Sequence, residues 1–255
     1  MNHVLLAIPL GLATGALLGL LGAGGSVLTV PALVYLLGQP VAAATTASLV
    51  IVSGNAAVGA AENARHGTLD RPLALRFGAA SVAGALLGSY LSRLVSGTTI
   101  LFLLAIVMLG SAWSLWKGRP VEVADARQTG GRRLLLVVGL GLTVGVLTGF
   151  FGVGGGFLIV PALVLLLGAP VRIAIGTSLV IITVTALTGL GGHLVTGGVS
   201  WPVTIAFGGA GVIGVLVGTR ASRRVTGDGL SRAFAVMLVA VALFLLVKNG
   251  LALAG

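Results

Sequence analysis

Long apolar runs follow one another along almost the whole chain, separated by short polar connections. Eight of these runs hold 18–23 residues, the length that an α-helix needs to cross the roughly 30 Å of hydrocarbon in a bilayer. Charged side chains make up 8% of the 255 residues, whereas a soluble domain carries about 25%. The sequence therefore predicts an all-α polytopic membrane protein. The predicted spans are residues 4–21, 43–62, 73–92, 98–116, 134–151, 173–195, 202–220 and 230–248.

The second half of the sequence repeats the first half at a distance of 130 residues. Between 11–59 and 141–189, 26 of 49 positions are identical without a gap, and such self-similarity indicates a duplicated structural unit. We expect a first transmembrane repeat at 1–117, a polar cytoplasmic linker at 118–133 and a second transmembrane repeat at 134–255.

Each repeat begins with an apolar run that glycine residues break. The short runs after the breaks, 27–37 and 157–167, hold eleven residues each. That corresponds to about 16 Å of helix, which is too short to cross a bilayer alone. Each repeat is therefore predicted as a glycine-broken helical hairpin followed by three transmembrane helices.

The basic residues distinguish two topologies. If each broken segment forms a hairpin, thirteen of the fifteen Lys and Arg residues face one side, and only Arg93 and Lys248 face the other. If each broken segment crosses once, the split is nine against six. Positive residues collect on the cytoplasmic side of membrane proteins, so the hairpin topology is favoured. It predicts inverted repeats and a multi-pass protein of the bacterial inner membrane with both termini in the periplasm.

The distribution of ionisable residues argues against several function classes. The chain has no Cys, and its five Asp and Glu residues fall in connections or at the ends of spans, so the usual deep carboxylates of proton or cation coupling are missing. The three His residues lie apart, without a second ligand at metal spacing. We therefore expect no metal, no cofactor and no enzymatic activity. The net charge of +10 is spread between the spans, which argues against a nucleic-acid partner.

The two glycine-rich breaks form the first candidate site. Unwound backbone is tolerated at membrane depth only where it is buried or lines a cavity, and the short helix after each break begins with free N–H groups and a positive dipole end. Two such ends meeting near the midplane would bind an anion without Lys or Arg. The alternative is that these glycines only let helices approach closely. The predicted binding residues are Gly22, Gly24, Gly25 and Ser26, with Gly152, Gly154, Gly155 and Gly156 in the second repeat.

Polar side chains on the next span of each repeat form the second candidate site. Hydroxyl and amide groups donate hydrogen bonds to anion oxygens, and the candidate ligands are Ser48, Asn55, Thr177 and Ser178. The alternative is that the hydroxyls bond to their own helix and that Asn55 joins two helices. The same spans also carry Thr45, Thr46, Ser53, Thr183, Thr185 and Thr188.

Three sequence motifs resemble a known family. GLLGAGGSVLTVPALVYLLG, its repeat GFFGVGGGFLIVPALVLLLG and the following AIGTSL resemble the TauE/SafE family of sulfite exporters, also called toluene-sulfonate uptake permeases. The resemblance covers essentially the whole chain. Its motif falls on the glycines of both breaks and on Pro31, Pro161, Thr177 and Ser178, whereas Thr46-Ala47-Ser48 replaces Gly-Thr-Ser in the first repeat.

The resemblance implies an inner-membrane carrier for sulfur-containing anions such as sulfite, sulfoacetate or related organosulfonates. Together with the inverted repeats, it leads us to expect a secondary transporter that works by alternating access. An anion channel of the same architecture and a carrier for a different small anion remain alternatives. The expected partners are a small anionic substrate and the lipid bilayer, with a homo-oligomer also open.

Overall fold

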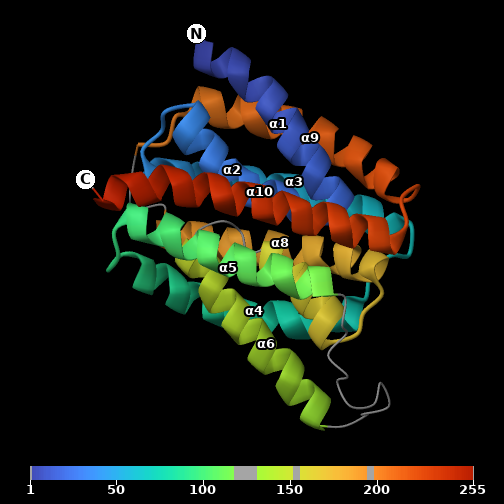
Figure 1. Ribbon diagram of the computed structural model, residues 1–255. Helices are drawn as coiled ribbons and strands as arrows, with labels where there is room; N and C mark the ends of the chain where they lie inside the picture. Colours follow the sequence, from blue (N-terminus) through green and yellow to red (C-terminus); the bar gives the residue numbers. More distant parts are fainter. Residues whose placement is uncertain (1, 118–130, 152–155, 194–197, 255) are drawn as a thin grey trace.

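The computed structural model of the protein describes residues 2–117, 131–151, 156–193 and 198–254. These residues form helices joined by turns, with no strand among them (Figure 1). The helices of the first repeat are α1 (Asn2–Leu21), α2 (Gly24–Pro31), η1 (Ala32–Leu36), α3 (Val41–Arg65), α4 (Arg71–Ser92) and α5 (Gly97–Lys117). Those of the second repeat are α6 (Gly131–Phe151), α7 (Gly156–Pro161), η2 (Ala162–Leu166), α8 (Val171–His193), α9 (Trp201–Ser222) and α10 (Gly227–Ala254).

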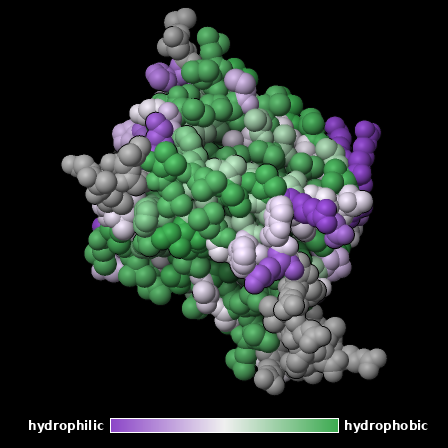
Figure 2. Space-filling model, in the orientation of Figure 1, coloured by the Kyte–Doolittle hydropathy of each residue, from purple (hydrophilic) through white to green (hydrophobic). Residues whose placement is uncertain are grey.

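Within the described residues, eight helices are long and apolar enough to cross a membrane. Their bounds fall within a few residues of the predicted spans, except that α10 continues to Ala254. Large apolar side chains stand on the surface, among them Leu75 and Leu135, each 73% exposed. Figure 2 shows a broad apolar face, with hydrophilic residues gathered mainly toward the right-hand edge. Such a surface suits lipid and not water, and the prediction of an all-α polytopic membrane protein is confirmed.

The first glycine break reverses the direction of the chain. Gly22 has φ +72°, a conformation that side chains other than glycine rarely adopt. After this turn α2 runs back along α1, and a Cβ atom built on Gly25 would overlap the carbonyl oxygen of Thr14 and lie 2.6 Å from the Cβ atom of Leu18. The short helix is therefore the second arm of a tight helical hairpin.

Each short helix widens into a π-helical turn directly after its proline. The N–H group of Leu37 donates to the carbonyl of Ala32 at 3.1 Å, and that of Leu167 donates to the carbonyl of Ala162 at 3.2 Å. A glycine at φ +64° then ends each helix, which is the usual conformation just past a helix C-terminus. Both repeats thus use the same local structure to turn from the short helix into the next span.

The two repeats exchange their first helices. α1 lies along α9 and α6 lies along α4, so the first helix of each repeat packs on the other repeat (Figure 1). Glycines make this contact possible: a Cβ atom built on Gly15 would overlap the carbonyl oxygen of Gly211, and one built on Gly145 would overlap that of Ser81. Small residues let membrane helices approach to backbone contact in this way.

The turns between helices collect at two ends of the bundle. At the terminus end, which holds the turns 37–40 and 93–96, a Cβ atom built on Gly97 would lie 3.2 Å from the Cβ atom of Val41. The linker end holds the turns 66–70, 167–170 and 223–226. Figure 1 shows the terminus end on the left, where the C-terminus also lies, and the linker end on the right.

At the linker end, side chains tie the turns together. The N–H group of Asp70 donates to Thr177 Oγ1 at 3.1 Å. The Arg172 guanidinium donates to the carbonyls of Arg223 at 3.2 Å and Val225 at 3.1 Å. These bonds join the start of α8 to the turns before α4 and α10.

Candidate functional site

The starts of the two short helices meet inside the bundle. A Cβ atom built on Gly156, the first residue of α7, would lie 2.9 Å from Ser26 Oγ and 3.0 Å from Ala23 Cα. Ser26 and Ala23 are fully buried. The sequence predicted that the two breaks would come together, and among the described residues Ser26 and Gly156 do so. Gly152, Gly154 and Gly155 lie outside the described residues.

The N-terminus of α2 carries no side-chain cap. The Ser26 hydroxyl donates instead to the carbonyl of Ala23 at 2.8 Å, so it faces backwards and leaves the first N–H groups of α2 to other partners. Uncapped N–H groups and the positive end of a helix dipole attract an anion. Gly24 is the first residue of α2, whereas Gly25 serves the contact with α1.

A hydroxyl from the second repeat binds the first break. Ser178 Oγ donates to the carbonyl of Gly22 at 2.9 Å and to that of Ile175 at 2.8 Å. Ser178 is fully buried, as is its neighbour Thr177. The structure therefore brings Gly22, Ser26, Gly156 and Ser178 to one place, while Thr177 points to the turn before α4, where its Oγ1 accepts the N–H group of Asp70.

Two candidate ligands on α3 have different surroundings. Ser48 is fully buried, and its hydroxyl has no hydrogen-bond partner among the residues that the structure describes. Asn55 lies two turns further along α3 and is 3% exposed. Its amide packs on the backbone of Gly211 in α9, since a Cβ atom built there would lie 3.0 Å from Asn55 Cγ. Asn55 thus joins α3 to α9, which is the alternative that the sequence left open.

Most other hydroxyls of these spans bond to their own helix. Thr183 donates to the carbonyl of Leu179 at 2.8 Å, and Ser53 donates to that of Val50 at 3.0 Å. Such bonds are common for Ser and Thr in membrane helices. The same pattern holds for Thr46, Thr185 and Thr188. These residues have structural partners and add nothing to the candidate site.

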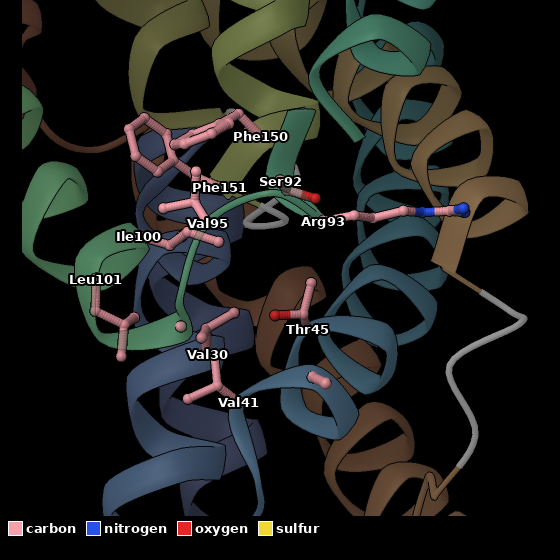
Figure 3. Close-up of a pocket in the computed structure, with 12 residues that line it drawn as sticks. Val30, Val41, Thr45, Ser92, Arg93, Val95, Ile100, Leu101, Phe150 and Phe151 are labelled. Atoms are coloured by element: carbon pink, nitrogen blue, oxygen red, sulfur yellow. The ribbon is translucent and has the colours of Figure 1, made fainter. Parts of the chain in front are cut away.

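A cavity of about 290 Å³ lies at the terminus end, between α2, α3, α5 and α6. Figure 3 shows Thr45 with its hydroxyl toward the enclosed space, Phe150 and Phe151 at the far wall, and Arg93 extending away from the other wall residues. Ser92 also lines the space. Thr45 and Arg93 were noted from the sequence, Thr45 as a further hydroxyl of its span and Arg93 for the topology, but neither was predicted to bind the anion. Val30, Phe150 and Phe151 belong to the repeated motifs, but the wall as a whole is assembled from segments far apart in the chain, so the sequence does not reveal it.

Acidic and metal-binding groups are scarce around these residues. Within the described ranges no three His, Asp or Glu side chains lie close enough to hold a metal ion. Glu62, at the end of α3, instead pairs with Arg223, with 3.4 Å between Oε1 and the guanidinium nitrogen. The described centre thus offers the uncapped N–H groups at the start of α2 and no carboxylate, which suits an anion.

The chain matches the protein family described as "Sulfite exporter TauE/SafE" over residues 7–245. It is 32% identical over 253 residues to a probable membrane transporter protein of Xylella fastidiosa, with 97% of each chain covered. It is 28% identical over 265 residues to the probable membrane transporter protein YunE of Bacillus subtilis, covering 94% of this chain and 96% of the relative. A probable membrane transporter protein of Methanocaldococcus jannaschii is 26% identical over 200 residues, 74% of this chain and 73% of the relative. No solved structure matches the chain.

Proposed function

This chain belongs to the sulfite exporter TauE/SafE family and is a membrane transporter, and from that premise we propose that its cargo is a small sulfur-containing oxyanion. Sulfite, sulfoacetate and related organosulfonates are the class in question. Each presents three oxygen atoms around one sulfur atom, and each oxygen accepts hydrogen bonds. Such a group needs several donors that converge on one point.

The contact between the starts of α2 and α7 carries the proposal. Gly156 of α7 lies against Ser26 of α2. The helix α2 has eight residues, and no side chain caps its N-terminus. The hydroxyl of Ser48, which has no partner among the described residues, adds a buried donor on α3. Helix N-termini and hydroxyls neutralise an anion without a fixed positive charge. A site without a buried Lys or Arg also releases its anion readily, which turnover requires.

We propose that transport proceeds by alternating access, with one repeat rocking against the other about this site. The exchanged helices α1 and α6 support this mechanism, because the first helix of each repeat packs on the other repeat and joins the two as they move. We also propose that the repeats are inverted and that both termini face the periplasm of a bacterial inner membrane. The basic residues Arg71, Arg172 and Arg223 at the linker end support this orientation.

Substrate binding to the purified protein tests the proposed cargo. An anion that binds only the native state at 100 times its Kd stabilises the protein by about 2.7 kcal/mol, which corresponds to a rise in Tm of roughly 5–10 °C for a chain of this size. We expect this rise with sulfite or sulfoacetate and none with phosphate. A rise with a cation or a neutral solute alone would contradict the proposal. Saturable flux supports a carrier, whereas ion-like conductance would indicate a channel.

Ser48→Ala locates the site in the same assay. A buried hydroxyl without a partner costs stability, so the variant without anion should melt at the same temperature as the parent or slightly higher. The rise in Tm with sulfoacetate should fall at least twofold, because a donor is lost. Ser53→Ala is the matched control, since Ser53 bonds to its own helix on α3. An unchanged anion response in Ser48→Ala would remove Ser48 from the site.

A further inference from the structure

We infer that the cavity at the terminus end is the open half of the substrate pathway, in a conformation that is closed at the linker end. The cavity of about 290 Å³ is at the lower limit of small-molecule pockets and large enough for a sulfonate with some water. The identity of the ligand in this inference rests on the proposed function, whereas the existence of the path does not.

The cavity leads toward the meeting point of the short helices. Phe151 in its wall is the last residue of α6 before the second break, and Val30 lies one turn along α2 from Ser26. Thr45 lies one turn before Ser48 on α3. The cavity wall therefore shares α2 and α3 with the proposed site, at residues one helical turn from Ser26 and Ser48.

The equivalent place in the second repeat is closed. Adding 130 to the wall residues Val30, Val41, Thr45, Ile100 and Leu101 gives residues 160, 171, 175, 230 and 231. These five residues, with Leu21 and others, enclose only about 10 Å³ at the linker end, which is about the space of one water molecule. Equivalent residues thus surround an open space in one repeat and a collapsed space in the other.

Two sequence differences explain the collapse. Ile175 takes the place of Thr45 and fills space with apolar atoms, being 3% exposed. Arg172 takes the place of Ala42, and its guanidinium bonds to the carbonyls of Arg223 and Val225. Alanine has no group to make the corresponding bonds at the terminus end. The linker end is therefore held by arginine hydrogen bonds that Ala42 cannot make at the terminus end.

An ion pair strengthens the same closure. Glu62 of α3 pairs with Arg223 after α9 at 3.4 Å, which ties the first repeat to the second at the same end of the bundle. The positions 130 residues away are Gly192 and Arg93, so no carboxylate stands at the equivalent place. Arg93 is exposed near the cavity and adds positive potential there, which raises the local concentration of anions.

A broad depression also lies at the linker end, between the turn 69–72, Pro170 and Ile173. None of its wall residues is equivalent to a residue of the cavity wall. It is a hollow of the outer surface around the starts of α4 and α8, and it does not open the collapsed space.

Cysteine labelling tests the inference, because the natural chain has no Cys. Thr45→Cys and its repeat-equivalent Ile175→Cys are placed in vesicles of known orientation and treated with a membrane-impermeant anionic methanethiosulfonate from each side in turn. We expect Thr45→Cys to react from the side of the termini at least tenfold faster than Ile175→Cys reacts from either side. Ile100→Cys and Leu230→Cys form a second pair in case the first does not fold.

Equal rates in the two members of each pair would overturn the inference. Reaction of Thr45→Cys with a lipid-soluble reagent alone would also overturn it, because the cavity would then open to the bilayer. Sulfoacetate should slow the labelling of Thr45→Cys, and it replaces sulfite as the probe because sulfite itself attacks sulfur electrophiles. Labelling that no sulfur anion slows would keep the pathway and contradict the proposed cargo. A rise in Tm with sulfoacetate beside an unreactive Thr45→Cys would do the reverse.

Discussion

Ser48 and Ser178 occupy equivalent positions in the two repeats, and their hydroxyl groups have different surroundings. Ser178 holds the carbonyl of Gly22 at the first break, whereas the Ser48 hydroxyl is buried without a partner among the described residues. One serine thus fixes the backbone of a break, and the other keeps a free donor. A duplicated motif can in this way have a structural partner in one copy and, in the other, supply a donor to the proposed site.

Ser178→Ala is expected to lower the stability of the protein. The Gly22 carbonyl would lose a donor, and leaving a buried acceptor unpaired costs about 1–3 kcal/mol. Thermal unfolding in detergent should show a Tm several degrees below that of the parent. Ser53→Ala again serves as the control, because its hydroxyl bonds only within α3. Equal melting temperatures in the two variants would mean that the bond to Gly22 contributes nothing.

The residues of the breaks could be predicted from the sequence, but the role of each candidate residue could not. Gly22 and Ser178 stand out because both fall in motifs that the two repeats share. Asn55 looked equally suited to bind a ligand, and only the structure places its amide on Gly211. The two residues are 156 positions apart, and the contact depends on how α3 crosses α9. Residue type and spacing hold no information about that crossing.

At the scale of elements, the positions of the helices could be predicted from the sequence, but which helices pack on one another could not. The span predicted at 43–62 is α3 (Val41–Arg65), which extends past the apolar run until Gly67 turns the chain at φ +69°. Glycines every four residues on α1 mark a face that another helix approaches. Both α4 and α9 offer small residues at that spacing, Ser81 and Gly211 being equivalent, so the choice of α9 required the structure.

Gly145→Ala tests the contact between α6 and α4. The added Cβ atom would overlap the carbonyl of Ser81 and come within 2.7 Å of Ser81 Cα, so the helices must move apart at a cost of about 1–3 kcal/mol. Gly139→Ala is the control on the same helix, since nothing lies within 4 Å of its added Cβ atom. Thermal unfolding should show a clear loss of stability for Gly145→Ala and none for Gly139→Ala, and the opposite order would refute the contact.

For the whole molecule, the two ends differ although the two repeats share one fold. The space at the terminus end is open and its counterpart at the linker end is closed, and the bonds of Arg172 and the pair of Glu62 with Arg223 lie at the closed end. The pair of Glu62 with Arg223 connects the two repeats, and the bonds of Arg172 connect two parts of the second repeat. Their loss should therefore change the balance between conformations more than the stability of the fold.

Glu62→Gln is expected to open the linker end in part. A partly exposed ion pair contributes about 0.5–1 kcal/mol, so its loss should raise the labelling rate of Ile175→Cys roughly two- to fivefold. Asp228→Asn is the control, because Asp228 is an exposed carboxylate at the start of α10 at the same end. A labelling rate of Ile175→Cys that responds equally to both substitutions would show that general charge, and not this ion pair, controls the opening.

The exchange of first helices also governs how the protein is made. About 180 residues separate the end of α1 from the start of α9, so at roughly 5–20 residues per second α1 waits about 10–35 seconds for its partner to be synthesised. During that interval its glycine face meets lipid or another protein. A nascent chain that stops after α5 cannot cover that face, because α9 is missing. Because of the order of synthesis, the packing of the first helix is completed only when the last helices of the chain have been made.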